Sequence, residues 1–390
     1  MNLNIGVLCL LENKKVLLVA NYTWNIWAFR QELVKELLKN KAYVYVVAGK
    51  DDYTEEVRRL GVELVSLQGP LNTVNPFREI LNIKYLFSAY MDIRPDIVHH
   101  YTIKPNMYGP FLARWSGAKV VVNMVTGLGS IFIGNSLIRR LTSGLVKRIY
   151  KKSFKRSDLI YFANQEDREE FIKASIVSRE KSCFIFGAGV DLARFCPYSN
   201  EEKSKAKSAL GFSKGEKIIL FVGRMTEEKG LLELAKAIKL ISDESVRLVL
   251  VGPEYPNPRA ITPGEIVSYD SRILYFGEVK EMLRYYGAAD VVVLPSYREG
   301  MPTVLLEAAA MGVPAVTTDV PGCRDAVLHG VTGWVVPPKN PSSLADSLVS
   351  ILNDKNKCEY LGNNARERSE LFDKKRIVTR IINDYSSLTH

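Results

Sequence analysis

The 390-residue sequence is poor in the residues that build metal centres and disulfide frameworks. It has five cysteines, an odd number, and no two of them form a C-x-x-C pair. Its four histidines also lack the spacing of metal ligands. We therefore expect neither a structural zinc site nor a disulfide framework, and a reducing cytoplasm is the default compartment.

Long apolar runs are also absent. The run from Ile5 to Leu11 has seven residues and no basic residue before it, so it is too short for a membrane span and lacks the charged start of a signal peptide. The longest charge-free stretch, Val120 to Ile138, contains polar residues and three glycines. It predicts a buried strand, a glycine-rich turn and a helix start rather than a transmembrane helix.

What the sequence has in excess is positive charge, with a formal net charge of +10. Residues 1–190 carry 27 basic and 17 acidic side chains, whereas residues 191–390 carry 26 of each. The excess therefore lies in the first half. Such a basic half suggests an anionic partner, which at this point is nucleic acid, a membrane surface or a phosphorylated substrate.

Apolar, β-branched runs alternate with helical patterns along the whole chain. Their continuous hydrophobicity is typical of parallel strands that helices cover on both faces. At this length we expect an α/β protein with two doubly wound, Rossmann-like domains facing each other across a cleft. The expected strands are residues 16–20, 43–48, 62–67, 96–99, 120–125, 158–162, 182–186, 217–222, 246–251, 272–276, 290–294, 313–317 and 333–336.

The domain boundary is expected between Gly187-Ala188-Gly189 and the polar, lysine-rich stretch Pro197 to Lys207, where the apolar pattern is interrupted. The predicted domains are an N-terminal domain (1–195) and a C-terminal domain (196–372). We expect residues 373–390 to form a helix that packs back toward the N-terminal domain.

Two segments carry candidate chemistry. The strand at 217–222 runs into Gly223, Arg224 and Lys229 just before a predicted helix, so backbone N–H groups, the helix dipole and two cations converge as in a diphosphate cradle. A polar turn with solvated charges is the alternative. In the second segment, Glu299 and Glu307 flank Gly300-Met301-Pro302-Thr303 at a helix start, where carboxylates can accept hydrogen bonds from a ribose diol and a second moiety.

Together these motifs resemble retaining glycosyltransferases of family 4, which have the GT-B fold. The resemblance covers the chain from Lys14 to the C-terminus. It rests on Gly223-Arg224 with Lys229-Gly230, the E-x7-E pair Glu299 and Glu307, and Thr318-Asp319-Val320-Pro321-Gly322. Residues 102–109 and 125–129 further resemble the subgroup that extends polyprenyl-diphosphate-linked sugars, often with N-acetylhexosamines.

The resemblance implies a role for each domain: the N-terminal domain (1–195) would bind the acceptor and face the membrane, and the C-terminal domain (196–372) would bind the nucleotide-sugar. It also implies a role for each site residue. Arg224, Lys229 and Glu299 would be catalytic: the two cations hold the donor diphosphate and the leaving UDP, and Glu299 binds the transferred sugar. Glu307 would bind ribose. The remaining donor-binding positions are Gly223, Gly300, Met301, Pro302 and Thr303.

One position departs from the family pattern. Many members have a histidine after the strand that corresponds to 120–125, where this chain has Thr126-Gly127. Candidates for the acceptor or donor-sugar side are Thr126, Gly127, His100, Lys104 and Asn106. For His99 and His100, which end an earlier strand, a packed or turn role is the favoured interpretation.

No metal and no cofactor are expected, with the UDP-sugar as a substrate. No two aspartates have D-x-D spacing, so cationic side chains replace a metal at the diphosphate. The dinucleotide pattern that begins at Gly127-Leu128-Gly129 fails, because Phe132 occupies its last position and no acidic ribose ligand follows.

Eight cations and no acid lie between Arg139 and Ser157, beside an apolar helical stripe of Ile138, Leu141, Leu145 and Ile149. This pattern favours docking on an anionic membrane, with a solvated helix face as the alternative, and disfavours nucleic acid.

The sequence thus predicts a metal-independent transferase, peripheral on the inner face of the cytoplasmic membrane. It would move a sugar, expected to be an N-acetylhexosamine, from a UDP-sugar to a polyprenyl-diphosphate-linked glycan in surface polysaccharide or glycoprotein glycan assembly. A UDP-sugar 2-epimerase of the same fold and a non-enzymatic basic adaptor on membrane or nucleic acid are the alternatives.

Overall fold

The computed structural model describes residues 10–67, 71, 75–127, 137–255 and 259–389. The chain divides into two compact units, which we call the N-terminal unit (residues 1–188 and 375–390) and the C-terminal unit (residues 189–374). The first division falls within Gly187-Ala188-Gly189, seven residues before the expected limit of 195. Residues 128–136 of the glycine-rich turn predicted after Val125 lie outside the described residues.

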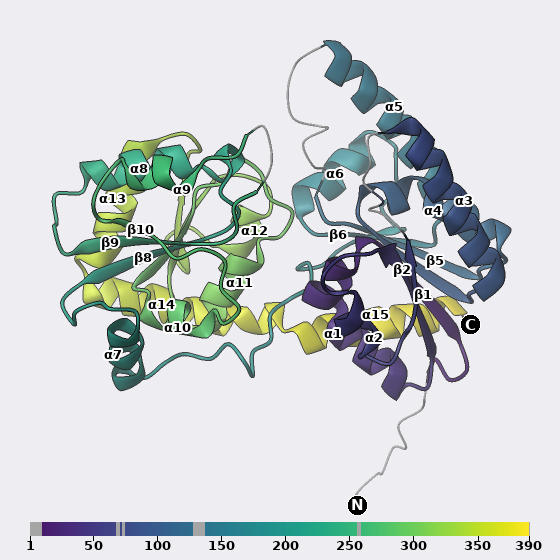
Figure 1. The fold of residues 1–390 in the computed structure, drawn as a ribbon, viewed down its shortest axis with the longest axis horizontal. Helices are drawn as coiled ribbons and strands as arrows, with labels where there is room; N and C mark the ends of the chain where they lie inside the picture. Colours follow the sequence, from purple (N-terminus) through teal and green to yellow (C-terminus); the bar gives the residue numbers. More distant parts are fainter. Residues whose placement is uncertain (1–9, 68–70, 72–74, 128–136, 256–258, 390) are drawn as a thin grey trace, which may run out of the picture. The chain divides into compact units, whose positions relative to one another are not determined.

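The N-terminal unit contains a seven-stranded parallel sheet with the order β3-β2-β1-β4-β5-β6-β7 (Figure 1). Because the strand order reverses between β1 and β4, the connecting helices cover both faces of the sheet. The helices α3, α4 and α5 lie on one face and α1, α2 and α15 on the other (Figure 1). The elements are β1 (Lys15–Tyr22), α1 (Thr23–Lys39), β2 (Tyr43–Gly49), α2 (Thr54–Arg58), β3 (Glu63–Leu67), α3 (Pro76–Ile93), β4 (Ile97–Tyr101), α4 (Ile103–Trp115), β5 (Val120–Val125), α5 (Leu137–Phe154), β6 (Leu159–Phe162), α6 (Gln165–Lys173), β7 (Ser182–Phe184) and α15 (Lys374–Thr389).

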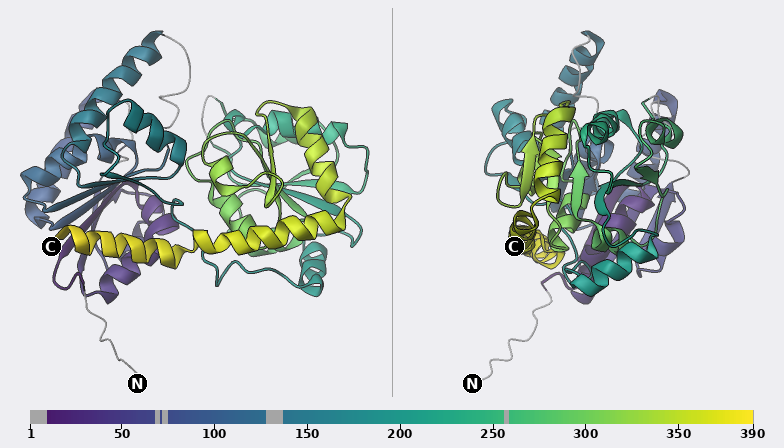
Figure 2. Two further views of the ribbon diagram at one scale, coloured as in Figure 1. Left: turned by 180° about the vertical axis from the view of Figure 1, so that it is seen from behind. Right: turned by 90° about the vertical axis from the view of Figure 1, so that its left-hand side faces the viewer.

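The last helix, α15, is part of the N-terminal unit although almost two hundred residues separate it from the rest of that unit (Figure 2). Its Tyr385 hydroxyl lies 2.5 Å from His99 Nδ1 on β4, and Tyr161 of β6 donates a hydrogen bond of 2.6 Å to its Asp384. These contacts seat the apolar side of α15 on the sheet, where Ile377, Ile381 and Tyr385 are buried.

The C-terminal unit contains a six-stranded parallel sheet with the order β10-β9-β8-β11-β12-β13. Its order reverses between β8 and β11. The elements are α7 (Asn200–Ala209), β8 (Lys217–Val222), the short 3-10 helix η2 (Glu227–Lys229), α8 (Leu231–Leu240), β9 (Val246–Val251), α9 (Pro263–Val267), β10 (Ile273–Tyr275), α10 (Leu283–Ala288), β11 (Val291–Leu294), α11 (Thr303–Ala310), β12 (Ala315–Thr318), α12 (Cys323–Ala326), β13 (Gly333–Val336), α13 (Pro341–Leu352), α14 (Lys355–Ser369) and η3 (Glu370–Phe372).

All thirteen predicted strands are present in the described residues, and their ends differ from the prediction by at most two residues. Their continuous apolar runs are buried as expected: β5 and β11, for example, are buried at every position. The doubly wound α/β prediction is therefore confirmed for each unit.

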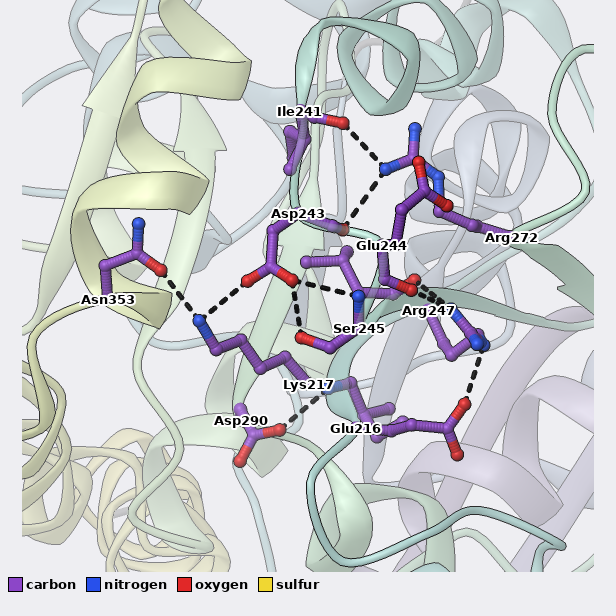
Figure 3. A network of polar contacts seen from close by, with 12 residues as sticks. Glu216, Lys217, Ile241, Asp243, Glu244, Ser245, Arg247, Arg272, Asp290 and Asn353 are labelled. Carbon is purple, nitrogen blue, oxygen red and sulfur yellow. Dashed lines mark hydrogen bonds and ion pairs between the residues drawn. The ribbon is translucent and has the colours of Figure 1, made fainter.

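A polar network ties together the ends of the C-terminal unit's strands at which the chain enters the sheet, which we call its amino edge (Figure 3). Lys217, the first residue of β8, donates 2.8 Å to Asp243 and 2.7 Å to Asn353. Arg272, before β10, donates to the backbone oxygens of Ile238 and Ile241. These charged side chains form hydrogen bonds with backbone groups and with other side chains, so their role at this edge is structural.

No helix in the described part of the chain is both long and apolar enough to cross a membrane.

Candidate active site

The candidate donor site lies at the opposite edge of the C-terminal sheet, where the parallel strands end. Strand β8 leads into Gly223, Arg224 and η2, and β11 leads into the loop before α11. These two strands flank the point at which the strand order reverses, where α/β sheets open a crevice for ligands. The sequence motifs after both strands are therefore brought to one place by the sheet topology.

Glycines let these loops touch backbone to backbone. Gly230 has φ +72°, and a Cβ added to it would lie 2.1 Å from the Pro295 carbonyl oxygen of the β11 loop. Gly322 has φ +77°, and its Cβ would lie 2.2 Å from the Gly300 carbonyl oxygen. A larger residue at either position would push the β11 loop away from its neighbours.

The closest charged contact of the site joins Lys229 and Glu299. Lys229 Nζ donates to Glu299 Oε1 at 2.5 Å, and only 16% and 13% of the two side chains are exposed. The hydroxyl of buried Ser296 donates to the same Oε1 at 2.6 Å. Ser296 was not predicted from the sequence. Its position, two residues after the end of β11, was the signal that could have identified it.

Arg224 lies on the more open side of the site, with 42% of its side chain exposed. Its guanidinium pairs with Glu228 at 3.2 Å and lies 4.6 Å from the ring centre of Tyr255. The contact with an aromatic face holds the cation without cancelling its charge.

Glu307 is the fifth residue of α11 and is half-buried. Tyr286 of α10 donates a hydrogen bond of 2.6 Å to its Oε2. Burial raises the pKa of the Glu307 carboxyl, while the Tyr286 hydrogen bond and the positive charges of Lys374 and Arg194 oppose that rise. Tyr286 was not found from the sequence, because a tyrosine in an apolar helix usually signals core packing.

The other donor-side positions surround these carboxylates. Gly223 follows β8, and its N–H donates to the Val251 oxygen at 2.9 Å. Pro302 is the N-cap residue of α11, so Thr303 rather than Pro302 begins the helix. Gly300 and Met301 lie in the loop before it. Cys323, the first residue of α12, is fully buried, and burial raises its pKa to about 12.

Two candidates of the N-terminal unit, His100 and Asn106, are buried. His100 has no exposed surface, its Nε2 lies 2.8 Å from the Tyr90 hydroxyl, and burial lowers its pKa to about 3. Asn106 is 1% exposed and donates to the Met124 oxygen at 2.7 Å. Lys104 is partly exposed and forms an ion pair with Glu79. In this structure the side chains of His100 and Asn106 offer almost no surface to a ligand, and His99, which precedes His100 on β4, is buried as well.

Thr126 and Gly127 differ from His100 and Asn106 in being accessible. They follow β5 at the carboxyl edge of the N-terminal sheet, and Thr126 is exposed. Beside them, after β4, Thr102 has φ +70°, a conformation that a β-branched residue rarely adopts. Such strain persists where the surrounding structure needs it, and Thr102 joins Thr126 as a candidate of this edge.

Within the described residues, no group of three or more His, Cys, Asp or Glu side chains is placed to hold a metal ion.

Comparison with known proteins agrees with this geometry. Residues 202–368 match the family model described as glycosyl transferases group 1, and residues 15–164 match the model described as glycosyl transferase 4-like. The chain therefore belongs to the glycosyltransferases of the GT-B fold. A HepE crystal structure from Anabaena, in complex with UDP and glucose, has the same fold, with a TM-score of 0.78, 18% identity and coverage of 96% of this chain and 100% of that one.

Two curated relatives narrow the class. Over 362 residues the chain is 28% identical to the N,N'-diacetylbacillosaminyl-diphospho-undecaprenol alpha-1,3-N-acetylgalactosaminyltransferase of Campylobacter jejuni, covering 93% of this chain and 95% of that protein. Over 284 residues it is 29% identical to the UDP-Gal:alpha-D-GlcNAc-diphosphoundecaprenol alpha-1,3-galactosyltransferase of Escherichia coli, covering 71% and 72%. The chain is a glycosyltransferase related to transferases that act on undecaprenyl-diphosphate-linked glycans.

Proposed function

We propose that the protein transfers an N-acetylhexosamine from a UDP-sugar to a polyprenyl-diphosphate-linked sugar, in the assembly of a surface polysaccharide or glycoprotein glycan. The activities named for the two relatives support this donor and acceptor class. The observation that carries the proposal is the meeting of Lys229 with Glu299 after β8 and β11. A cation for the diphosphate and a carboxylate for the sugar are thereby held together at the crevice of the sheet.

The proposed reaction retains the configuration of the donor sugar. The bond between C1 of the sugar and the diphosphate oxygen breaks, and the acceptor hydroxyl forms the new bond on the same face. Its proton passes to the departing diphosphate oxygen. Arg224 and Lys229 stabilise the negative charge that develops there, and no side chain has to act as a nucleophile.

We propose that the reaction needs no metal ion, because the two cations supply the charge that a metal would otherwise supply. Arg224→Ala and Lys229→Ala should each lower transfer by about 100-fold. Arg247→Ala, at the amino edge of the same sheet, removes a similar ion pair with Glu216 at 2.8 Å and serves as the control. Undiminished transfer by both donor-site variants would contradict the assignment of the diphosphate site.

The donor and acceptor are tested with a panel of UDP-sugars, a short polyprenyl-diphosphate sugar acceptor and purified full-length protein. Transfer with retained anomeric configuration, unchanged by a chelator, is the expected result. Isomerisation of the UDP-sugar without any acceptor would instead support the 2-epimerase alternative. Lipid binding without measurable UDP-sugar binding would support the adaptor.

Peripheral membrane association is the second part of the proposal. Among the described cations, Arg148, Lys151 and Lys152 on α5 and Lys155 and Arg156 just after it are exposed. The side chains of Arg139 and Arg140, like those of Ile138 and Leu141, lie outside the described residues. Of the predicted apolar stripe, Leu145 is 59% exposed. Near an anionic leaflet each exposed cation contributes about 1 kcal/mol.

Helix α3 adds an apolar surface that the charge pattern did not reveal. It exposes Phe77 (78%), Ile80 (65%), Leu81 (50%) and Tyr85 (55%) on the same side of the sheet as α5. Exposed aromatic and aliphatic side chains beside cations suit the interface of an anionic bilayer.

This part is tested by sedimentation with anionic and neutral vesicles. The double variants Lys151→Glu with Lys152→Glu, and Phe77→Ser with Ile80→Ser, should each reduce binding to anionic vesicles. Leu240→Ser removes a comparably exposed leucine (60%) from the C-terminal unit and should leave binding unchanged. Equal binding by all variants would contradict the membrane proposal.

A further inference from the structure

The structure contains a buried hydroxyl whose place goes beyond the donor-binding motifs. Tyr286 of α10 is fully buried, and its hydroxyl donates to Glu307 Oε2 at 2.6 Å. The next nearest acceptor, the Val304 oxygen, is 3.5 Å away. The tyrosine is thus directed at one oxygen of one carboxylate.

The side chains that surround Tyr286 fix the direction of its hydroxyl group. The Tyr286 ring packs edge-on against Phe195, with ring centres 5.9 Å apart. Its neighbour Gly287 leaves room for the Tyr198 ring, which would lie 2.3 Å from an added Cβ. Since α10 is clamped between aromatic rings and the sheet, the hydroxyl has little freedom to follow a moving partner.

The carboxylate, by contrast, has one oxygen committed and one available. Among the described residues, Tyr286 donates the one side-chain hydrogen bond that reaches Glu307, and Oε1 accepts none. An ionised carboxylate offers about four lone-pair sites, so Oε1 can accept the two vicinal hydroxyls of a ribose without disturbing Tyr286.

From this geometry we infer that Tyr286 is a positioning residue for nucleotide recognition: by holding Glu307 Oε2 it presents Oε1 to the ribose diol of the donor. The inference rests on the proposed ribose-binding role of Glu307 and deepens it. A freely rotating glutamate at the same position would have to lose side-chain entropy on binding, and Tyr286 removes that cost before the donor arrives.

The test measures the affinity of the full-length protein for UDP and for 2′,3′-dideoxy-UDP by calorimetry. The ratio of the two affinities reports recognition of the diol alone. Tyr286→Phe should weaken UDP by about tenfold, the worth of a hydrogen bond to a charged group, and should hardly affect dideoxy-UDP. In the transferase assay it should raise the donor KM and change kcat by less than about twofold.

A matched control separates positioning from stability. Tyr161→Phe removes an equivalent tyrosine–carboxylate hydrogen bond, of 2.6 Å to Asp384, from the N-terminal unit. It should lower Tm as Tyr286→Phe does and leave the affinity ratio unchanged. A ratio that falls equally in both variants would overturn the inference, because the effect would then be one of general destabilisation.

The Glu307 variants distinguish failure of the inference from failure of the ribose assignment. If Glu307→Ala lowers the ratio and Tyr286→Phe does not, the inference alone is wrong. If Glu307→Ala leaves the ratio unchanged, the ribose assignment is wrong and the inference falls with it.

A double variant covers the case in which Tyr286→Phe does not fold. Tyr286→Phe with Glu307→Gln removes the buried hydroxyl and the charge together, which is less disruptive than leaving either one unpaired. Its affinity ratio should equal that of Glu307→Gln. A further fall in the ratio would overturn the inference, because Tyr286 would then act without Glu307.

Discussion

Lys229 and Glu299 form an ion pair of 2.5 Å although they are 70 residues apart and follow different strands. In the free protein the proposed phosphate-binding cation is therefore neutralised by the proposed sugar-binding carboxylate. Lys229 keeps two further N–H donors and Glu299 keeps further acceptor sites, so a donor can bind both residues while the pair stays formed. Ser296 adds a hydrogen bond to the same carboxylate.

This pairing predicts that stability and activity respond differently to mutation. Lys229→Ala should lower the free energy of unfolding by about 1–3 kcal/mol, because Glu299 is left buried and short of a partner. Lys229→Met with Glu299→Gln should recover most of that stability and remain inactive in transfer. Urea unfolding and transfer assays measure the two effects, and a double variant as unstable as Lys229→Ala would argue against the pairing.

A pH effect on donor binding follows from Glu307. Its charged neighbours are Lys374 and Arg194, with Tyr286 as hydrogen-bond donor, and burial nevertheless raises its pKa. The ionised form accepts the ribose hydrogen bonds, so UDP affinity should fall as pH drops through this raised pKa, at a higher pH than for an ordinary glutamate. Calorimetry across the mildly acidic range measures it, with Glu307→Gln expected to remove that titration step.

Stability, by contrast, should respond to acid through Asp243 at the amino edge. Hydrogen bonds from Lys217 and from Ser245 lower its pKa well below the ordinary value. Because the folded-state pKa is the lower one, the stabilisation is complete above the unfolded-state pKa and is lost as pH falls toward the folded-state value. Asp243→Asn should cost about 1 kcal/mol at neutral pH, a figure reduced for the partial exposure of the pair, and nothing in strong acid. Urea unfolding at both pH values checks this, and an unchanged donor KM shows that the site is untouched.

Thr102 gives a prediction for the N-terminal unit. With φ +70°, it should be replaceable by glycine with a gain of about 1 kcal/mol, since relief of backbone strain exceeds the entropic cost of glycine. If this segment after β4 orients the acceptor, Thr102→Gly raises the acceptor KM and leaves the donor KM unchanged. Thr102→Ala, which retains the Cβ and the strain, is the control. Loss of stability in the glycine variant would contradict the strained conformation.

The helix and strand pattern was largely readable from the sequence because parallel strands covered on both faces leave a continuous apolar signal. Strand β5 was placed at its observed residues, 120–125, for this reason. The E-x7-E spacing was equally local: Glu299 falls in the loop before α11 and Glu307 in its second turn, as a helix start near Pro302 requires.

Contacts between segments that are far apart in the sequence could not be predicted from such local patterns. His100 lies near the end of β4, at the carboxyl edge of the sheet, which made it a candidate, yet the packing of Tyr90 and α4 leaves it no exposed surface. Tyr286 gave an ordinary core signal, although the tertiary fold points its hydroxyl at Glu307.

The net charge of +10 shows the same division. The sequence by itself determined that the positive excess lies in residues 1–190, because charge is additive and needs no coordinates. Only the tertiary structure decided that Phe77 and Ile80 remain exposed on α3 and that Lys229 is paired with Glu299. Burial and pairing depend on which chain segments pack together. The order of the strands in each sheet determines which segments become neighbours.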